Sequence, residues 1–290
     1  MNFSIFQSIE YQRGGERLNI VEIFKVILIG IIEGITEWLP ISSTGHMLLF
    51  DEFIALKMSE NFKEMFFVVI QLGAILAVVV LFFKKLFPVS VKDKIVRVEK
   101  SVVNMWMKIA AACLPSAILG FLLDDILEAY FGNALTISIM LIVYGALFIF
   151  IENRNKSRLS KTDDIFQIDY KTAVLIGLFQ ALAMIPGTSR SGATIIGALL
   201  LGVSRTAAAE FSFFLAVPTM LGASAFKLMK FGFDFSSEEF LVLSIGMITA
   251  FAVSLLSIKF LMNFVRNHSF KSFGLYRIIL GAIVLLITFI

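Results

Sequence analysis

The stretch EGITEWLPISSTGH, residues 33–46, decides how this sequence is interpreted. It places two carboxylates, a run of three hydroxyls and a histidine within a chain that is 58% hydrophobic. Ionisable side chains are costly in apolar surroundings and are retained there mainly where they bind or react. The stretch therefore indicates a polar site set into an otherwise apolar protein.

The composition around this stretch is that of an integral membrane protein. The mean hydropathy is +0.90, and 16% of the residues are charged, against about 25% in soluble proteins. The apolar runs lack the alternation of a membrane β-barrel, so they predict helices. The expected fold is all-α, with six transmembrane helices at 66–83, 109–123, 135–151, 211–229, 240–262 and 275–290.

The distribution of lysine and arginine predicts the orientation of these helices. Three basic connections, 84–108, 152–171 and 263–277, are expected on the cytoplasmic side. The connections 124–134 and 230–239 carry acidic residues and at most one lysine. They are expected outside, so the six spans alternate in direction.

Two further apolar segments, 20–50 and 173–203, are not ordinary spans. Each consists of two short stretches separated by a cluster of proline, serine, threonine and glycine. Stretches of about 10–14 residues are too short to cross the hydrocarbon core. Each segment therefore predicts a re-entrant helical hairpin, which is tolerated at membrane depth only beside protein or a water-filled cavity.

The two hairpins are similar in sequence. GIIEGITEWLPISSTG (30–45) aligns without gaps to GLFQALAMIPGTSRSG (177–192), with glycine at both ends and Glu33 opposite Gln180. Three spans lie between them, so the two halves must have opposite orientations. We therefore expect inverted repeats whose hairpin tips meet near the middle of the membrane.

The expected organisation is a polar extension followed by one membrane domain. Residues 1–19 are mixed polar, and no signal-peptide core is evident there. Residues 20–290 form the membrane domain, with repeat one at 20–152 and repeat two at 170–290. The single cysteine, Cys113, excludes a disulfide framework within the chain.

The first hairpin carries a pair of carboxylates and a cluster of hydroxyls. Glu33 and Glu37 are four residues apart, so they share one face of a helix. Two buried like charges need a cation between them, either a divalent metal ion or an arginine. Pro40 ends this helix, and hydroxyls follow at the start of the next one, where free backbone N–H groups favour an anion; they belong to Ser42, Ser43 and Thr44.

The second hairpin supplies the expected partner for an anion. PGTSRSGAT, residues 186–194, holds Arg190, whose planar guanidinium suits phosphate oxygens. Hydroxyls surround it at Thr188, Ser189, Ser191 and Thr194. His46 lies one helical turn beyond Ser43, whereas His268 lies in a basic connection and is expected to be solvated. Together these groups predict a site for a phosphorylated, metal-chelated ligand, with acid–base or nucleophilic chemistry.

Four motifs carry a family resemblance. EGITEWLPISSTGHMLL, QLGAILAVVV, PGTSRSGATI and AAAEFSFFLAVP resemble the signatures of the bacterial undecaprenyl-diphosphate phosphatase family associated with bacitracin resistance. The resemblance covers roughly residues 20–290. It implies hydrolysis of undecaprenyl diphosphate to the monophosphate and phosphate, which recycles the lipid carrier of cell-wall synthesis. It also implies ten helices, six spanning and four in two re-entrant hairpins.

The resemblance assigns roles residue by residue. It places the acidic pair on Glu33 and Glu37, the reactive serine on Ser43, and the histidine on His46. It places the phosphate-binding arginine on Arg190, beside Ser189, Ser191 and Thr194. The expected mechanism has Mg²⁺ or Ca²⁺ near the two glutamates and attack by Ser43 with His46 as base; nucleophilic attack by His46 is the alternative. Ser42, Thr44 and Thr188 are assigned to substrate binding.

The expected partners are the polyprenyl diphosphate and membrane lipids, with no nucleic acid. Bacitracin would compete by sequestering the substrate, and a homodimer is left open. The expected location is the bacterial cell membrane, as a multi-pass protein with an outward-facing site. Two other classes remain open: an inverted-repeat transporter or flippase of an anionic polyprenyl lipid, and a structural membrane protein.

Overall fold

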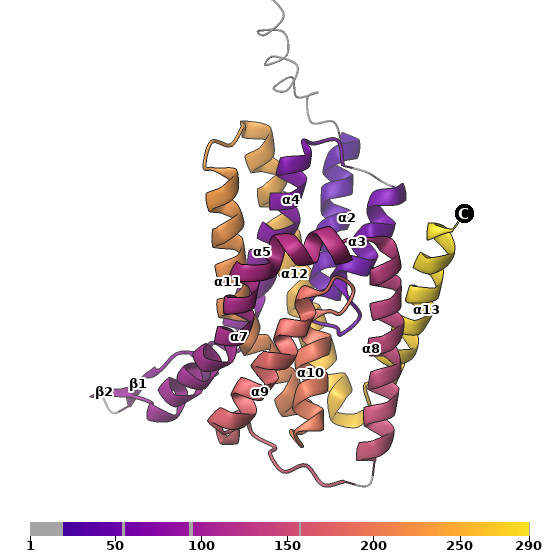
Figure 1. The fold of residues 1–290 in the computed structure, drawn as a ribbon. Helices are drawn as coiled ribbons and strands as arrows, with labels where there is room; N and C mark the ends of the chain where they lie inside the picture. Colours follow the sequence, from indigo (N-terminus) through magenta and orange to yellow (C-terminus); the bar gives the residue numbers. More distant parts are fainter. Residues whose placement is uncertain (1–19, 54–55, 93–94, 157, 290) are drawn as a thin grey trace, which may run out of the picture.

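The computed structural model describes residues 20–53, 56–92, 95–156 and 158–289 (Figure 1). The extension 1–19 lies outside these residues. Within them the chain is almost entirely helical, which confirms the all-α prediction. Six helical stretches are long and apolar enough to cross a membrane: α4 with α5 (Glu60–Val69, Gln71–Leu81), α7 (Lys100–Phe131), α8 (Ala134–Asn155), α11 (Arg205–Phe231), α12 (Ser237–Asn267) and α13 (Lys271–Thr288). The six predicted spans are therefore confirmed by length and composition.

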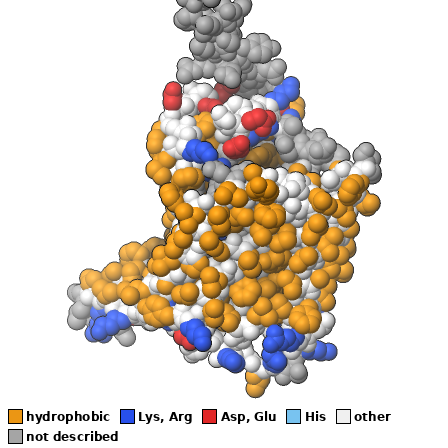
Figure 2. Space-filling model, viewed as in Figure 1, with side chains coloured by type: hydrophobic (Ala, Val, Ile, Leu, Met, Phe, Trp, Pro, Cys, Tyr) orange, Lys and Arg blue, Asp and Glu red, His pale blue; other side chains and the backbone are white. Residues whose placement is uncertain are grey.

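The surface is divided into an apolar belt and two charged ends. Figure 2 shows hydrophobic side chains over the middle of this face, acidic side chains together with basic ones near one end, and mainly basic side chains at the other. Phe121, Phe240 and Leu256 are among the large apolar residues that are exposed. Exposed apolar surface of this extent is stable against lipid and not against water. The protein is thus a multi-pass membrane protein.

Two short helical hairpins lie inside this bundle. The first consists of α2 (Ile20–Thr36) and α3 (Ser43–Phe53). The second consists of α9 (Tyr170–Ala181), the 3₁₀ turn η2 (Leu182–Met184) and α10 (Arg190–Leu200). The hairpins enter from opposite ends of the bundle, and their connecting loops meet near its middle (Figure 1). This arrangement brings residues 37–42 next to residues 185–189.

Each hairpin packs against a long helix of the other half of the chain. α2 lies along α12, and α9 lies along α7. Close approach requires glycine at equivalent positions: a Cβ on Gly30 would collide with the Gly246 carbonyl, and one on Gly177 would collide with the Ala112 carbonyl. Gly30 and Gly177 are the first residues of the two aligned segments, so the sequence similarity corresponds to similar packing.

The two tips also share an unusual backbone conformation. Ser42 has φ +75° and Ser189 has φ +70°, and they are the only non-glycine residues with positive φ in the part of the chain that the structure describes. Such conformations are strained for serine and concentrate at functional sites. Each serine caps the following helix, because Ser42 Oγ accepts from the Gly45 amide at 3.5 Å and Ser189 Oγ from the Gly192 amide at 3.2 Å. In the alignment of 30–45 with 177–192, Ser42 is paired with Ser189 and Gly45 with Gly192.

One element departs from the all-helical expectation. After the short helix α6 (Phe83–Leu86), strands β1 (Val89–Lys92) and β2 (Ile95–Val98) pair in antiparallel fashion. The sequence analysis treats this region only as a basic connection. VSVK alternates β-branched with polar residues, and IVRV is β-branched except for Arg97, which are features typical of strands. The remaining short element is the 3₁₀ helix η1 (Ile165–Gln167) in the connection between α8 and α9.

Candidate active site

Arg190 joins the two hairpin tips. Its Nη2 donates to Glu37 Oε1 at 2.8 Å, and its Nη1 donates to the Ser212 carbonyl at 2.7 Å. The guanidinium carbon lies 5.8 Å from the centre of the Trp38 ring. Both charged side chains are nearly excluded from solvent, with exposed fractions of 12% for Arg190 and 6% for Glu37. The structure thus brings together the predicted cation and one of the two predicted carboxylates, from segments 153 residues apart.

The second carboxylate, Glu33, is buried and incompletely paired. Its side chain interacts with Glu37 one turn further along, and its Oε1 has no hydrogen-bond partner in the described structure. Ser43 Oγ donates to the other oxygen of Glu37, Oε2, over a long 3.5 Å. Glu37 therefore lies between Arg190 and Ser43, with Glu33 beside it. A buried oxygen without a partner is costly and indicates room for a cation or water.

His46 is held by two hydrogen bonds, neither of which involves Ser43. Its Nδ1 lies 2.7 Å from the Ser42 carbonyl oxygen, and its Nε2 lies 2.7 Å from the Tyr276 hydroxyl. A carbonyl can only accept, so Nδ1 carries the hydrogen and, in the neutral ring, Nε2 accepts from Tyr276. The rings of His46 and Tyr276 also stack, with centroids 5.6 Å apart. Tyr276 was missed by sequence reasoning because nothing local to α13 marks it.

Thr194 supports Arg190 instead of facing open space. Its Oγ1 lies 2.9 Å from the Arg190 carbonyl oxygen and 2.8 Å from Ser212 Oγ. Ser212 in turn accepts from Arg190 through its carbonyl. Thr194 and Ser212 are both buried, so they fix the first turn of α10 and the direction of the arginine side chain. Ser212, on α11, was also missed from sequence.

The other predicted hydroxyls differ in their availability. Ser189 Oγ and Ser191 Oγ lie 3.2 Å apart at the start of α10, where backbone N–H groups are free. Thr188 is fully buried, and its Oγ1 has no partner in the described structure. Thr44 is exposed at the start of α3. Thr188, Ser189 and Ser191 thus lie at the tip of the second hairpin, and Ser42 and Ser189 are both occupied in capping.

Arg277 corrects the sequence analysis, which places it in the cytoplasmic connection 263–277. It is fully buried in α13 and bridges the tips: Nη1 donates to the Pro40 carbonyl at 3.2 Å, and Nη2 donates to the Gly187 carbonyl at 2.8 Å. No ion-pair partner of Arg277 is found among the described residues. Charges were counted per connection, and this count does not single out one arginine. Arg277 also falls inside the predicted span 275–290, however, and an arginine inside a span indicates a functional role.

Buried polar atoms without partners gather at the tips. In the described residues, six such side-chain atoms are found. Five lie at or beside the two hairpin loops: Glu33 Oε1, Trp38 Nε1, Thr188 Oγ1, Arg190 Nε and Arg277 Nε. Native structures leave few buried polar groups unpaired, and each usually has a ligand, water or catalytic reason. The cluster therefore indicates a binding site with donors for an anion and a carboxylate for a cation.

Comparison with known proteins identifies the family to which the sequence is similar. The family model described as "Bacitracin resistance protein BacA" matches residues 26–283. A relative from Enterococcus faecalis named undecaprenyl-diphosphatase is 66% identical over 272 residues, covering 93% of this chain and 99% of the relative. Relatives of the same name from Desulfitobacterium hafniense and Acetivibrio thermocellus are 61% and 57% identical, each covering 92% of this chain and 96% and 97% of their own lengths.

Proposed function

This chain belongs to the BacA family of bacitracin resistance proteins, and from that membership we infer that it hydrolyses undecaprenyl diphosphate. The products are undecaprenyl phosphate and inorganic phosphate, so the enzyme recycles the lipid carrier of cell-wall synthesis. Removal of the diphosphate also removes the form that bacitracin sequesters. The structural observation that best supports this activity is the Arg190–Glu37 ion pair between the hairpin tips, beside Ser43.

Ser43 is the nucleophile of the proposed reaction. Its Oγ forms a bond to the terminal phosphorus, and the bond from that phosphorus to the bridging oxygen breaks, which releases undecaprenyl phosphate. Water then cleaves the phosphoserine and releases phosphate. Arg190 stabilises the charge on the transferring phosphoryl group, together with N–H groups at the start of α10. Arg277 positions both tips by holding the carbonyls of Pro40 and Gly187.

Glu37 accepts the proton of Ser43 in this proposal. It is the group to which Ser43 Oγ donates in the structure, at 3.5 Å, and such bonds commonly shorten when substrate binds. His46, predicted from the sequence as the base, would first have to release Tyr276. In its present contacts His46 instead holds the Ser42 carbonyl, and so fixes the turn that presents Ser43.

A divalent cation fits the two glutamates. Glu33 Oε1 lacks a partner, and carboxylate oxygens are the ligands that Mg²⁺ and Ca²⁺ prefer. No group of three or more acidic, histidine or cysteine side chains suited to a metal occurs among the described residues, so the diphosphate and water would complete the coordination, as is usual for Mg²⁺. Such an ion, held by Glu33 and Glu37, would neutralise charge on the diphosphate.

Phosphate release from a purified sample tests both the activity and the cation. We expect the protein in neutral detergent to release phosphate from undecaprenyl diphosphate in the presence of Mg²⁺ or Ca²⁺, and to stop when EDTA is added in excess. Restoring the divalent ion should restore the rate.

The outcomes separate enzyme from transporter. A lipid transporter built on the same hairpins would bind the diphosphate without releasing phosphate, so a sample that binds substrate and releases none would contradict the assignment. If phosphate release were undiminished in EDTA, the proposed divalent cation would be contradicted, but the proposed hydrolysis would not.

We also propose that the two hairpins are re-entrant and that the halves are inverted repeats. Support comes from the aligned pairs that share geometry: the glycines that pack on α12 and α7, the strained serines of the tips, and the capped amides of Gly45 and Gly192. A two-fold axis in the membrane plane generates such an exchange of partners between halves. The hairpins are too short to span the bilayer in a single helix.

The active site is proposed to open on the outer face of the bacterial cell membrane. The test uses the Cys113→Ser protein in whole cells, with one new cysteine at either end of α8. Asn133→Cys should react with a membrane-impermeant maleimide, and Lys156→Cys should react only after the cells are permeabilised, because basic ends stay inside. Both positions are exposed. The reverse pattern of labelling would invert the orientation and contradict an outward site.

A further inference from the structure

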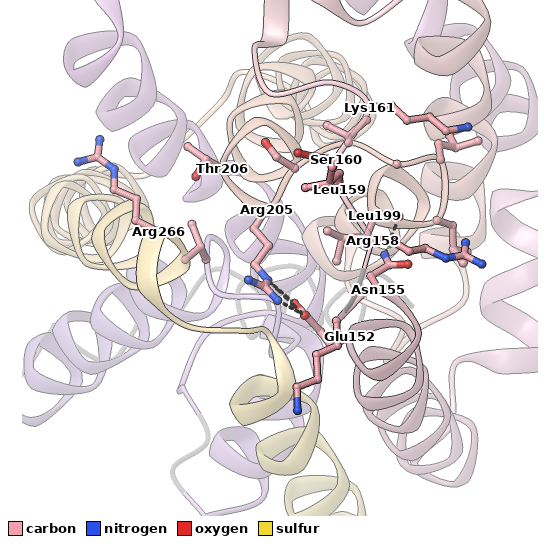
Figure 3. Close-up of a pocket in the computed structure, with 17 residues that line it drawn as sticks. Glu152, Asn155, Arg158, Leu159, Ser160, Lys161, Leu199, Arg205, Thr206 and Arg266 are labelled. Carbon is pink, nitrogen blue, oxygen red and sulfur yellow. Dashed lines mark hydrogen bonds and ion pairs between the residues drawn. The ribbon is translucent and has the colours of Figure 1, made fainter.

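A basic cavity lies at the end of the bundle where lysine and arginine gather. It has a volume of about 380 Å³ and is formed by the ends of α8, α10 and α12, the start of α11, and the connection after α8 (Figure 3). Its charged lining consists of five cations and one carboxylate: Lys156, Arg158, Lys161, Arg205, Arg266 and Glu152. None of these residues takes part in the active site.

The one carboxylate of the cavity is already neutralised. Arg205 donates to Glu152 from Nε at 2.9 Å and from Nη2 at 2.6 Å, as the dashed lines in Figure 3 show. Glu152 is 2% exposed and also accepts from the backbone amide of Phe270 at 2.9 Å. This pair ties α8 to α11 and to the start of α13. The other four cations have no ion-pair partner within 4.0 Å among the residues that the structure describes.

The start of α11 adds donors of a different kind. Ser204 caps this 27-residue helix by accepting from the Ala207 amide at 3.3 Å. The amides of Arg205 and Thr206 belong to its first turn, where N–H groups lack helical partners and the helix dipole favours an anion. Thr206 adds a hydroxyl to the same wall. Positive side chains therefore surround a cavity that also contains a helix start.

The rim of the cavity is apolar. Leu159, between Arg158 and Lys161, is 95% exposed. Leu200 and Leu201, the last residue of α10 and its C-cap, also line the cavity and are half-buried. A free phosphate ion would gain nothing from the exposed Leu159, whereas an acyl chain would cover it. Unpaired cations beside an exposed apolar side chain are typical of the membrane interface. They suit a ligand that has both an anionic headgroup and acyl chains.

We propose that this cavity binds the phosphate headgroup of an anionic phospholipid in the leaflet at the basic end of the protein. Basic pockets between transmembrane helices at the cytoplasmic side bind such headgroups. The phosphate lies at the start of α11, where the amides of the first turn and the Thr206 hydroxyl can donate to it. Lys156, Arg158 and Arg266 supply positive charge around the cavity, and the acyl chains pass over Leu159. The cavity combines α8 of the first half with α10 to α12 of the second, so the lipid stabilises the junction between halves. This site does not depend on the proposed hydrolysis.

Thermal unfolding of the purified protein in neutral detergent tests the site. The additions are phosphatidylglycerol, phosphatidylcholine and inorganic phosphate, each titrated separately. We expect phosphatidylglycerol to raise the Tm with saturation and the other two to leave it unchanged. In the variant Lys156→Gln/Arg158→Gln/Arg266→Gln, half-saturation should need at least roughly tenfold more phosphatidylglycerol, since each basic residue near an anionic surface contributes measurably to binding.

A matched variant controls for general surface charge. Lys100→Gln/Arg154→Gln/Lys171→Gln removes the same charge from exposed residues that are not part of the cavity lining, and it should keep the wild-type response. If both variants lost the response to phosphatidylglycerol equally, the effect would come from general surface charge and the cavity site would be contradicted. Stabilisation by inorganic phosphate alone would identify a free-anion site, and no response of the wild type to phosphatidylglycerol would reject the site.

A second variant covers the case in which the triple change fails to fold. Arg158 is exposed, and its side chain makes no hydrogen bond in the described structure, so Arg158→Glu should leave folding intact. It should weaken the response to phosphatidylglycerol more than Arg154→Glu, which makes the same reversal outside the cavity. Equal responses of these two variants would contradict the proposal.

Discussion

Replacing Arg190 with lysine is expected to lower kcat/KM for undecaprenyl diphosphate by at least roughly 100-fold, the scale of one lost oxyanion-type donor. The substitution keeps the positive charge but removes the planar guanidinium group, which can donate two parallel hydrogen bonds. Arg190 now donates to Glu37 from one nitrogen and to the Ser212 carbonyl from another. A lysine ammonium reaches one of these partners as a point charge, and it does not present two parallel donors to a phosphoryl group. Phosphate release by purified variants measures the effect.

The control for this change is Arg154→Lys, because Arg154 is an exposed arginine at the basic end, outside the active site. It should retain wild-type turnover. The Tm of Arg190→Lys should be recorded as well, since the loss of the Ser212 contact also weakens the anchoring of α10 to α11. Near wild-type turnover in Arg190→Lys would exclude Arg190 as the phosphoryl-binding group.

The fold was predictable from sequence to the extent that length and charge determine it. The six spans follow from the length of the apolar runs, and the hairpins follow from runs too short to cross a bilayer. The gapless alignment of 30–45 with 177–192 anticipates paired positions such as Ser42 and Ser189. The strands β1 and β2 were not anticipated, because a four-residue alternation is a weak signal inside a charged connection.

Of the candidate site, only the residues that lie in the two hairpins were predictable from the sequence. Glu37, Ser43 and Arg190 follow from residue types that are rare in apolar segments. Tyr276 and Ser212 do not, because each hydroxyl, on a long helix, acquires a role only through a tertiary contact, with His46 across 230 residues and with Arg190 across 22. Arg277 was assigned to a connection because charges were counted per connection, although it also lies inside the predicted span 275–290. Its bonds to the carbonyls of Pro40, Gly187 and Thr188 leave no pattern in the sequence.

Replacing Ser43 with alanine is expected to abolish turnover, with a loss of at least about 10³-fold, because the attacking oxygen is removed. Thr44→Ala is the matched control. The neighbouring hydroxyl is exposed and makes no hydrogen bond in the described structure, so its loss should cost about tenfold or less. Phosphate release from undecaprenyl diphosphate is measured for both. A larger loss in Thr44→Ala than in Ser43→Ala would reject the assignment of Ser43.

The nature of the covalent adduct separates Ser43 from His46 as nucleophile. His46→Ala should also be severe under either assignment, because His46 Nδ1 holds the carbonyl of Ser42, next to the attacking residue. Residues that act as a unit are not additive, so Ser43→Ala/His46→Ala should be little worse than the worse single variant. Loss of activity alone therefore does not distinguish the two side chains, and the chemistry of a trapped phosphoryl-enzyme does.

Substrate labelled in its terminal phosphate should leave label on the protein after rapid quenching. A phosphoserine survives acid and is lost in base, whereas a phosphohistidine, as a phosphoramidate, is lost in acid and survives base. We expect the acid-stable adduct in the wild type and none in Ser43→Ala, because Ser43 Oγ lies at the start of α3 and already donates to Glu37. An acid-labile adduct that persists in Ser43→Ala would transfer the nucleophile to His46, and Ser43 would then serve as a phosphate ligand at the helix start.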